Sequence, residues 1–137
     1  KEYPIASTND IDSPLLNYLY TQEIGYDVDG SPITAYVESG DLGIGDGESF
    51  MMVNRIIPDY TFTGNESEAS IEVKLKGRNF PLEDASDLST ATVTSSTTQS
   101  FVRARAREQI VRIESSGEGY GWSLGDLRLG IRTDGRR

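Results

Sequence analysis

The 137-residue sequence contains no cysteine and no histidine. Without cysteine there is no disulfide framework and no thiolate nucleophile. Without histidine the chain lacks the commonest general base and the commonest metal ligand. The glycine patterns that present a serine nucleophile or cradle a phosphate are missing as well. We therefore expect a protein that is not an enzyme, needs no cofactor and binds no metal.

Long apolar runs and targeting signals are also missing. No stretch approaches the 18 apolar residues of a membrane-spanning helix, so we expect no membrane partner. No secretory signal is visible, and the sequence opens on Lys1 rather than methionine. We expect the chain to be a processed or partial piece of a longer protein, with a length that suits one domain.

Charge is unevenly distributed along the chain, whose formal net charge is -9. Residues 1–100 carry five basic side chains against 17 acidic ones, whereas residues 101–137 carry eight arginines against five acids. An acidic body with an arginine-rich end suits head-to-tail or lateral contacts between copies. The sequence therefore favours a homo-oligomer.

The apolar pattern predicts about seven strands and no helix. Residues 71–75 alternate between apolar and charged side chains, as in a half-buried strand. Residues 50–53 are continuously apolar, as in a strand covered on both faces. The fold class is all-β with antiparallel sheets, forming part of a β-propeller-like body or, alternatively, a β-sandwich. The residues expected to face the core are Ile71, Val73, Leu75, Val111, Ile113, Leu127 and Leu129.

Two domain segments are expected. Residues 1–16 mix turn formers with isolated apolar residues, which predicts an extended arm or loop. Residues 17–137 form the β-rich domain. Within it, the step Asp29-Gly30 predicts a hairpin, and the Ser/Thr-rich residues 81–100 predict a mobile polar loop with a short strand around 92–94.

The stretch FVRARAREQIVRIES, residues 101–115, places Arg103, Arg105 and Arg107 on one face of a strand. Nucleic-acid binding is one interpretation. However, a single-strand binder interleaves aromatic residues with its cations, and here the intervening residues are alanines. We expect the arginines to bond carboxylates or backbone carbonyls of a neighbouring strand or subunit. Beyond Glu108 the inward face changes phase, which predicts a bulge or turn at residues 108–109.

Other candidate sites have simpler interpretations. Asp27, Asp29 and Glu38 have the spacing of a calcium loop, but Pro32 stands where such a loop requires glycine, and a hairpin turn is favoured. Close acid pairs such as 41 with 46, or 83 with 84, arise by chance among 22 acids and do not define a glycosidase. Trp122, the single tryptophan, is expected to be a core or interface anchor.

Four pieces of the sequence resemble a known family. They are YVESGDLGIGDGESF (36–50), RIIPD (55–59), RARAREQIVRIES (103–115) and WSLGDLRLGIRTDGRR (122–137). The pattern resembles the carboxy-terminal part of tail nozzle, or tail stabilisation, virion proteins of short-tailed bacteriophages. None of the four pieces is catalytic, so the resemblance brings no active-site residues.

The resemblance implies a β-rich, propeller-like body in a ring of identical subunits, which is a hexamer in the nozzles of short-tailed phages. Such a ring belongs to the virion and extends the tail tube below the portal and adaptor. Its partners would be the adaptor and a tail fibre or spike, and DNA would pass through without sequence-specific binding. The residues expected at subunit interfaces or in sheet pairing are Arg103, Arg105, Arg107, Trp122, Arg136 and Arg137.

Two other function classes remain open at this point. One is a carbohydrate-binding or depolymerising tail domain, which would show a groove with exposed aromatic residues and a carboxylate pair. The other is a calcium-dependent adhesion sandwich, which would melt at a temperature that depends on calcium.

Overall fold

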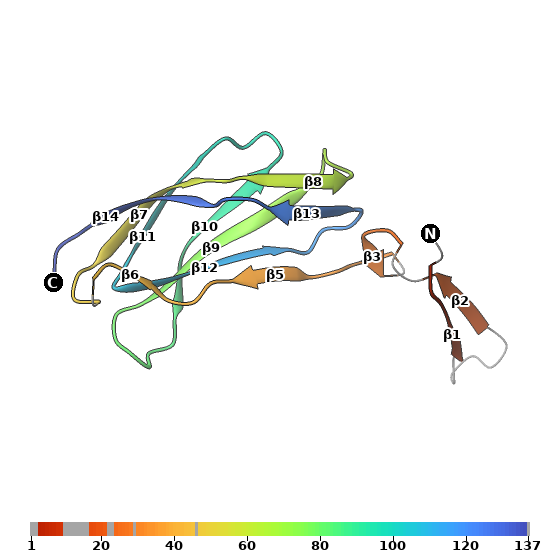
Figure 1. Ribbon diagram of the computed structural model, residues 1–137, viewed down its shortest axis with the longest axis horizontal. Helices are drawn as coiled ribbons and strands as arrows, with labels where there is room; N and C mark the ends of the chain where they lie inside the picture. The colour runs from red at the N-terminus through yellow and green to blue at the C-terminus, as the bar shows by residue number, and fades with distance from the viewer. Residues whose placement is uncertain (1–2, 10–16, 22–23, 29, 46, 137) are drawn as a thin grey trace.

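The computed structural model describes residues 3–9, 17–21, 24–28, 30–45 and 47–136. Fourteen strands and no helix occur in these residues, and every strand pairing is antiparallel (Figure 1). The predicted all-β class with antiparallel sheets is confirmed. No helix in the described part of the chain is long and apolar enough to cross a membrane.

The first sheet has the strand order β10–β9–β12–β5, with β6 also paired to β12. Alternation between buried and exposed residues is clearest in β9 and β12, as the sequence predicts. The strands of this sheet are β5 (Ala35–Glu38), β6 (Leu42–Gly43), β9 (Ser70–Arg78), β10 (Ser86–Thr94) and β12 (Glu108–Ser115).

The second sheet has the order β11–β7–β14. A separate two-stranded pair, β13–β8, is connected to it, because β8 follows β7 in the chain and β13 precedes β14. Pro58 lies between β7 and β8, where its missing N–H cannot interrupt a ladder. The strands are β7 (Met51–Ile57), β8 (Tyr60–Gly64), β11 (Ser100–Ala106), β13 (Tyr120–Leu124) and β14 (Arg128–Thr133).

Two short hairpins precede the sheets. Within the predicted arm, β1 (Ile5–Asn9) is a strand that pairs with β2 (Asn17–Thr21). The predicted tight turn is present, because β3 (Asp27–Val28) pairs with β4 (Ser31–Pro32). Gly30 has φ 73° there, and its N–H donates to Asp27 Oδ1 at 3.1 Å. Asp29 lies outside the described residues.

The core lies between the two sheets. Ile71, Val73, Leu75, Val111 and Ile113 of the first sheet are buried, together with core residues of the second such as Val53, Ile56 and Ala104. Leu127 and Leu129 are partly buried and pack against this cluster. The predicted core is therefore confirmed. Two facing antiparallel sheets around one core are compatible with a β-sandwich.

The chain passes from one sheet to the other at Arg107, between β11 and β12. Ala104 and Ala106 face inward before the bend, and Gln109, Val111 and Ile113 face inward after it. The predicted phase change is confirmed, with the bend one residue earlier than expected. Gly77 lies opposite Gln109, and a Cβ there would be 2.6 Å from Ala106 Cβ. Glycine therefore lets β9 run close beneath this corner.

Residues 81–100 need a correction. Ser86–Thr94 forms the nine-residue strand β10, in place of the loop predicted there, and the expected short strand at 92–94 is only its end. Ala91 and Val93 point into the core opposite Val73 and Ile71. The Ser and Thr residues that made the segment look like a loop occupy the other face of an end strand, where β-branched threonine is well accommodated.

Candidate functional site

The arginines near the end of β11 differ in the number of contacts that they make with the rest of the chain. Arg105 Nε donates to Asp134 Oδ2 at 2.6 Å, and its terminal nitrogen donates to the Asp134 carbonyl at 3.1 Å. Its guanidinium also lies 3.8 Å from the centre of the Phe50 ring, a cation–π distance. Arg105 thus ties β11 to the segment that follows β14.

Arg107 and Arg103 differ from Arg105. A terminal nitrogen of Arg107 donates to the Arg136 carbonyl at 3.5 Å, and its guanidinium lies 5.2 Å from the Phe50 ring centre. The Arg107 Nε is buried without a hydrogen-bond partner among the described residues. Arg103 is exposed, and its side chain makes no ion pair or hydrogen bond with the described residues. Arg137 lies outside the described residues.

Trp122 is partly buried and packs against the core. Its Nε1–H donates to Ser115 Oγ at 2.8 Å, and its ring meets Tyr60 edge to face with 6.4 Å between centroids. Burial raises the pKa of the Tyr60 hydroxyl to about 12. Trp122 therefore anchors β13 to β8 and β12.

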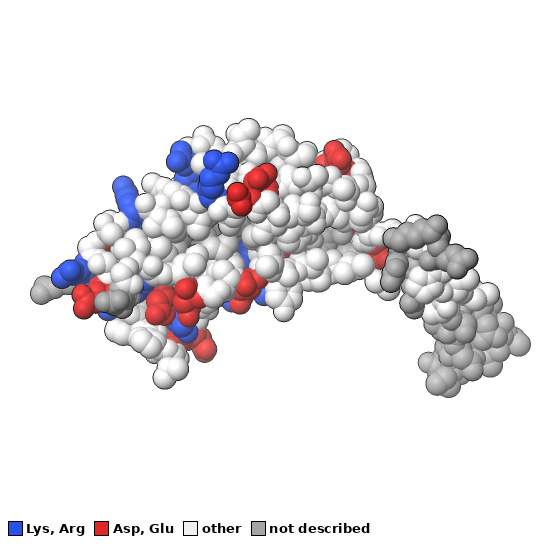
Figure 2. Space-filling model, viewed as in Figure 1, with Lys and Arg blue, Asp and Glu red and all other residues white. Residues whose placement is uncertain are grey.

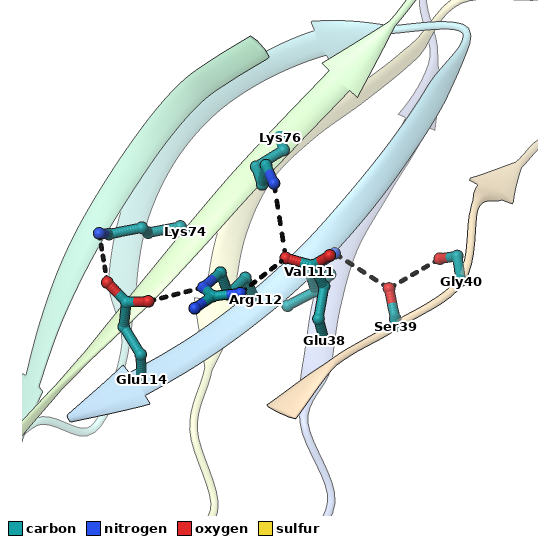
Figure 3. Close-up of polar contacts among 8 residues, drawn as sticks. All are labelled: Glu38, Ser39, Gly40, Lys74, Lys76, Val111, Arg112 and Glu114. Carbon is teal, nitrogen blue, oxygen red and sulfur yellow. Dashed lines mark hydrogen bonds and ion pairs between the residues drawn. The ribbon is translucent and has the colours of Figure 1, made fainter. Parts of the chain in front are cut away.

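A row of opposite charges crosses the outer face of the first sheet (Figure 3). Glu114 accepts from Lys74 and, at 2.6 Å, from Arg112 Nε, while Arg112 also reaches Glu38 at 3.2 Å. Lys76 lies 3.5 Å from the same Glu38 oxygen. We call these five residues the charged row. It connects β9, β12 and β5.

The charged row shifts the pKa values of its members. Hydrogen bonds from Lys74, and then from Arg112, hold the Glu114 pKa below its usual value. The hydrogen bond from Arg112 lowers the Glu38 pKa in the same way. The pKa values of Lys74 and Arg112 are raised, in both cases chiefly by the hydrogen bond to Glu114. All four groups are therefore charged at neutral pH.

The register explains why the row needs three strands. Arg112 lies directly opposite both Lys74 and Glu38, so one of its two neighbours carries a like charge. Glu114, two residues along on the same face, offsets that repulsion by binding both cations. The alternation in β9 predicted that Lys74 and Lys76 lie on the outer face, but the sequence analysis did not identify their acidic partners. Arg112 and Glu114 alternate with the buried residues of β12, and this pattern could have indicated that they share the outer face.

The sequence pieces that carry the family resemblance bond to one another. In the first pair, the Ser39 N–H donates to the Val111 carbonyl at 2.9 Å, and the Val111 N–H donates to Ser39 Oγ at 3.0 Å. In the second, the Gly125 N–H donates to the Asp59 carbonyl at 2.7 Å, and a Cβ on Gly125 would be 2.6 Å from Asp59 Oδ2. The first pair therefore joins β12 to the end of β5, and the second joins the β7–β8 connection to the β13–β14 connection.

Two members of the candidate acid pairs, Asp41 and Glu83, bond to other groups of the chain. Asp41 pairs with Arg78, which also holds Glu108 at 2.7 Å, and Asp46 lies outside the described residues. Glu83 accepts from two backbone N–H groups, at 3.0 and 3.3 Å, and so stabilises its own turn.

Asp27 and Glu38, the described acids of the calcium-loop pattern, make different contacts. Asp27 closes the β3–β4 turn and Glu38 belongs to the charged row. Among the described residues, no group of three acids is placed to hold a metal ion.

A polar hollow of ≈ 510 Å³ lies at one end of the first sheet. Tyr120, the aromatic residue in its lining, is buried, and its hydroxyl donates to the Ser70 carbonyl at 2.6 Å. Serine and threonine residues also line it. The carboxylates of the lining belong to Glu68, Glu72, Glu114 and Glu118.

No protein-family model matches this chain, and no curated protein matches it in sequence. The function is therefore argued from the contacts described above.

Proposed function

We propose that this chain is a structural component of a bacteriophage tail: a nozzle or tail-tube ring that continues the DNA channel below the portal and adaptor. One observation carries the proposal beyond the sequence resemblance. The motif residues that produce the resemblance engage one another: Glu38 with Arg112, Asp59 with Gly125, and Arg105 with Asp134.

Such use of motif residues supports a scaffold. A catalytic motif directs its polar side chains at a substrate, whereas these side chains bond neighbouring strands and fix their register. The proposed protein is not an enzyme and needs no cofactor. It acts by holding a defined shape in the virion.

The assembly we propose is a homo-oligomeric ring, a hexamer by analogy with nozzles, which contacts an adaptor and a tail fibre or spike. A propeller-like body is the finer fold that accompanies this proposal. The ring itself does not depend on it, because a sandwich with free sheet edges can equally well be repeated around an axis.

Electrostatics suits a DNA conduit. The net charge is -9, and basic and acidic side chains lie beside one another on the face shown in Figure 2, without a continuous basic stripe there. A negative surface repels the phosphate backbone, so DNA can slide past without being held.

The test is the mass and symmetry of the native assembly. Native mass spectrometry and electron microscopy of the purified protein, alone and with the adjoining tail proteins, should show a closed ring with a central channel. A protein that stays monomeric with those tail proteins present would overturn the proposal.

The polar hollow favours a second candidate, a carbohydrate-binding or depolymerising tail domain. Its carboxylates and hydroxyls are groups that bind sugars. Turnover of a host polysaccharide that disappears in Glu68→Gln or Glu118→Gln would establish this alternative in place of the scaffold.

A further inference from the structure

One side of the two-sheet arrangement is open. The first sheet ends there at β5 and β6, and the second ends at β14, with β13 continuing along it. An apolar groove of ≈ 240 Å³ lies between these edges. Its lining consists of Val37, Glu38, Ser39, Leu42, Val111, Ile113, Leu124, Leu127 and Leu129.

The groove has the properties of a strand-binding site. End strands present unpaired N–H and C=O groups that can pair with another strand. Val37, Leu42 and Leu124 are 44%, 37% and 40% exposed although they are apolar. The volume is below the roughly 300–1,000 Å³ of small-molecule pockets. Its shape and chemistry therefore suit a few apolar side chains of an added strand.

The same chain carries a segment with the matching chemistry. The β1–β2 hairpin lies apart from the two sheets (Figure 1), and a two-stranded hairpin alone is marginally stable in water. Its register, with Ser7 opposite Leu19 and Ile5 opposite Thr21, puts Ile5 and Leu19 on one face. These side chains are 68% and 79% exposed. The hairpin thus presents two exposed apolar side chains on one face.

Charge indicates that the occupant is another copy. Copies of a chain with a net charge of -9 repel one another over most of their surfaces. The two hairpin strands contain no charged residue. The charged residue of the groove lining, Glu38, is neutralised by Arg112 and Lys76. Hairpin and groove are therefore surfaces at which two copies can meet without repulsion.

We propose that the groove between β5–β6 and β13–β14 binds the β1–β2 hairpin of a neighbouring copy. The contact is head-to-tail, so repetition closes a ring when the rotation permits. The inference rests on the ring assembly proposed above and specifies its interface.

The test uses paired charge variants and sedimentation velocity. The hairpin variant is Ile5→Asp with Leu19→Asp, and the groove variant is Leu42→Asp with Leu124→Asp. The matched control, Leu82→Asp with Phe101→Asp, places the same charges on residues that are 98% and 78% exposed and lie outside the groove lining. Circular dichroism confirms that each variant is folded.

Wild type and control should assemble alike, and each of the other variants should associate at least tenfold more weakly. An equimolar mixture of hairpin and groove variants should form dimers, because one intact groove then meets one intact hairpin.

A cross-linking arm covers the case in which a groove variant does not fold. The sequence has no cysteine, so Leu19→Cys in one copy and Leu42→Cys in another can be joined by a bis-maleimide. The 19–42 cross-link should form in the mixture, and a mixture of Leu19→Cys with Leu82→Cys should give no cross-link between these positions.

Two results would overturn the inference. A hairpin variant that assembles like wild type, with no 19–42 cross-link, refutes this interface and leaves the ring intact. Wild type that stays monomeric at all concentrations, alone and with the adjoining tail proteins, refutes both the interface and the ring.

Discussion

Gln109 sits at the corner where the chain changes sheets, with 1% of its surface exposed. Its Nε2 donates to the Met51 carbonyl at 2.8 Å and to the Ala104 carbonyl at 3.2 Å. One side-chain amide therefore joins β12 to β7 and β11.

Gln109→Ala should lower the free energy of unfolding by about 1–3 kcal/mol, because two buried carbonyls lose their donor. Urea denaturation measures the change. Gln99→Ala removes the same group from an exposed position before β11 and should have little effect. Equal losses in both variants would show that the corner bond is unimportant.

Glu114 predicts how stability depends on pH. Its pKa is lower in the folded chain than in the unfolded chain, because Lys74 and Arg112 bind its charged form. As the pH falls, the unfolded chain takes up its proton first, near the ordinary value of about 4.3. The stabilisation is therefore complete above that pH and is lost below it.

Glu114→Gln should consequently be less stable than wild type at neutral pH, and the difference should narrow as the pH falls below about 4.3. Urea unfolding across this range measures it. Glu66→Gln is the control, since Glu66 is exposed and makes no ion pair among the described residues. A difference that stays constant with pH would contradict the proposed cause.

At the scale of the element, the arginines on the outward face of β11 differ in their contacts within the chain. Arg105 lies opposite Met52, which is only 4% exposed although it is on the outer face of the sheet. Arg132 of β14 lies opposite Met52 from the other side. Side chains directly opposite one another on a sheet lie within contact distance, so Met52 has an arginine on each side.

Arg105→Gln should therefore destabilise the protein by up to about 1 kcal/mol, the range of an exposed pair, plus a contribution from the lost contact with Phe50. Arg103→Gln should stay within about 0.5 kcal/mol of wild type. The triple variant, with Arg107→Gln added, should be the least stable of the three. A much larger loss of stability in Arg103→Gln would indicate that Arg103 contacts another molecule in the native assembly.

At the scale of the whole molecule, the balance of charge governs binding to DNA. The arginine-rich residues 101–137 are joined to an acidic body, and Arg105 and Arg112 contact carboxylates of the same chain. The acidic body repels the phosphate backbone, which opposes DNA binding by the other arginines.

Wild type should bind DNA weakly, with little dependence on salt, and the triple arginine variant should do the same. A fluorescence titration at several salt concentrations measures the slope. If wild type binds tightly with a steep salt dependence and the triple variant does not, the nucleic-acid interpretation of β11 is correct.

The sequence by itself determined which faces of several strands are buried. The period-two pattern of residues 71–75 and 111–113 identified core positions, because alternation is a local property of an extended chain. The change of phase near Arg107 was predicted for the same reason, whereas the turn at Gly30 was predicted from its Asp-Gly step. The pattern failed at β10, where small polar residues suit both a loop and the outer face of an end strand.

Only the tertiary structure decided which strands are neighbours. Glu38 and Arg112 are 74 positions apart, and Asp59 and Asp126 are 67 apart. Periodicity shows which way a side chain points, but carries no record of the strand that pairs with it. That choice depends on how all the apolar faces are buried together. The charged row and the open groove between the sheet edges are products of strand order, and strand order is a property of the whole chain.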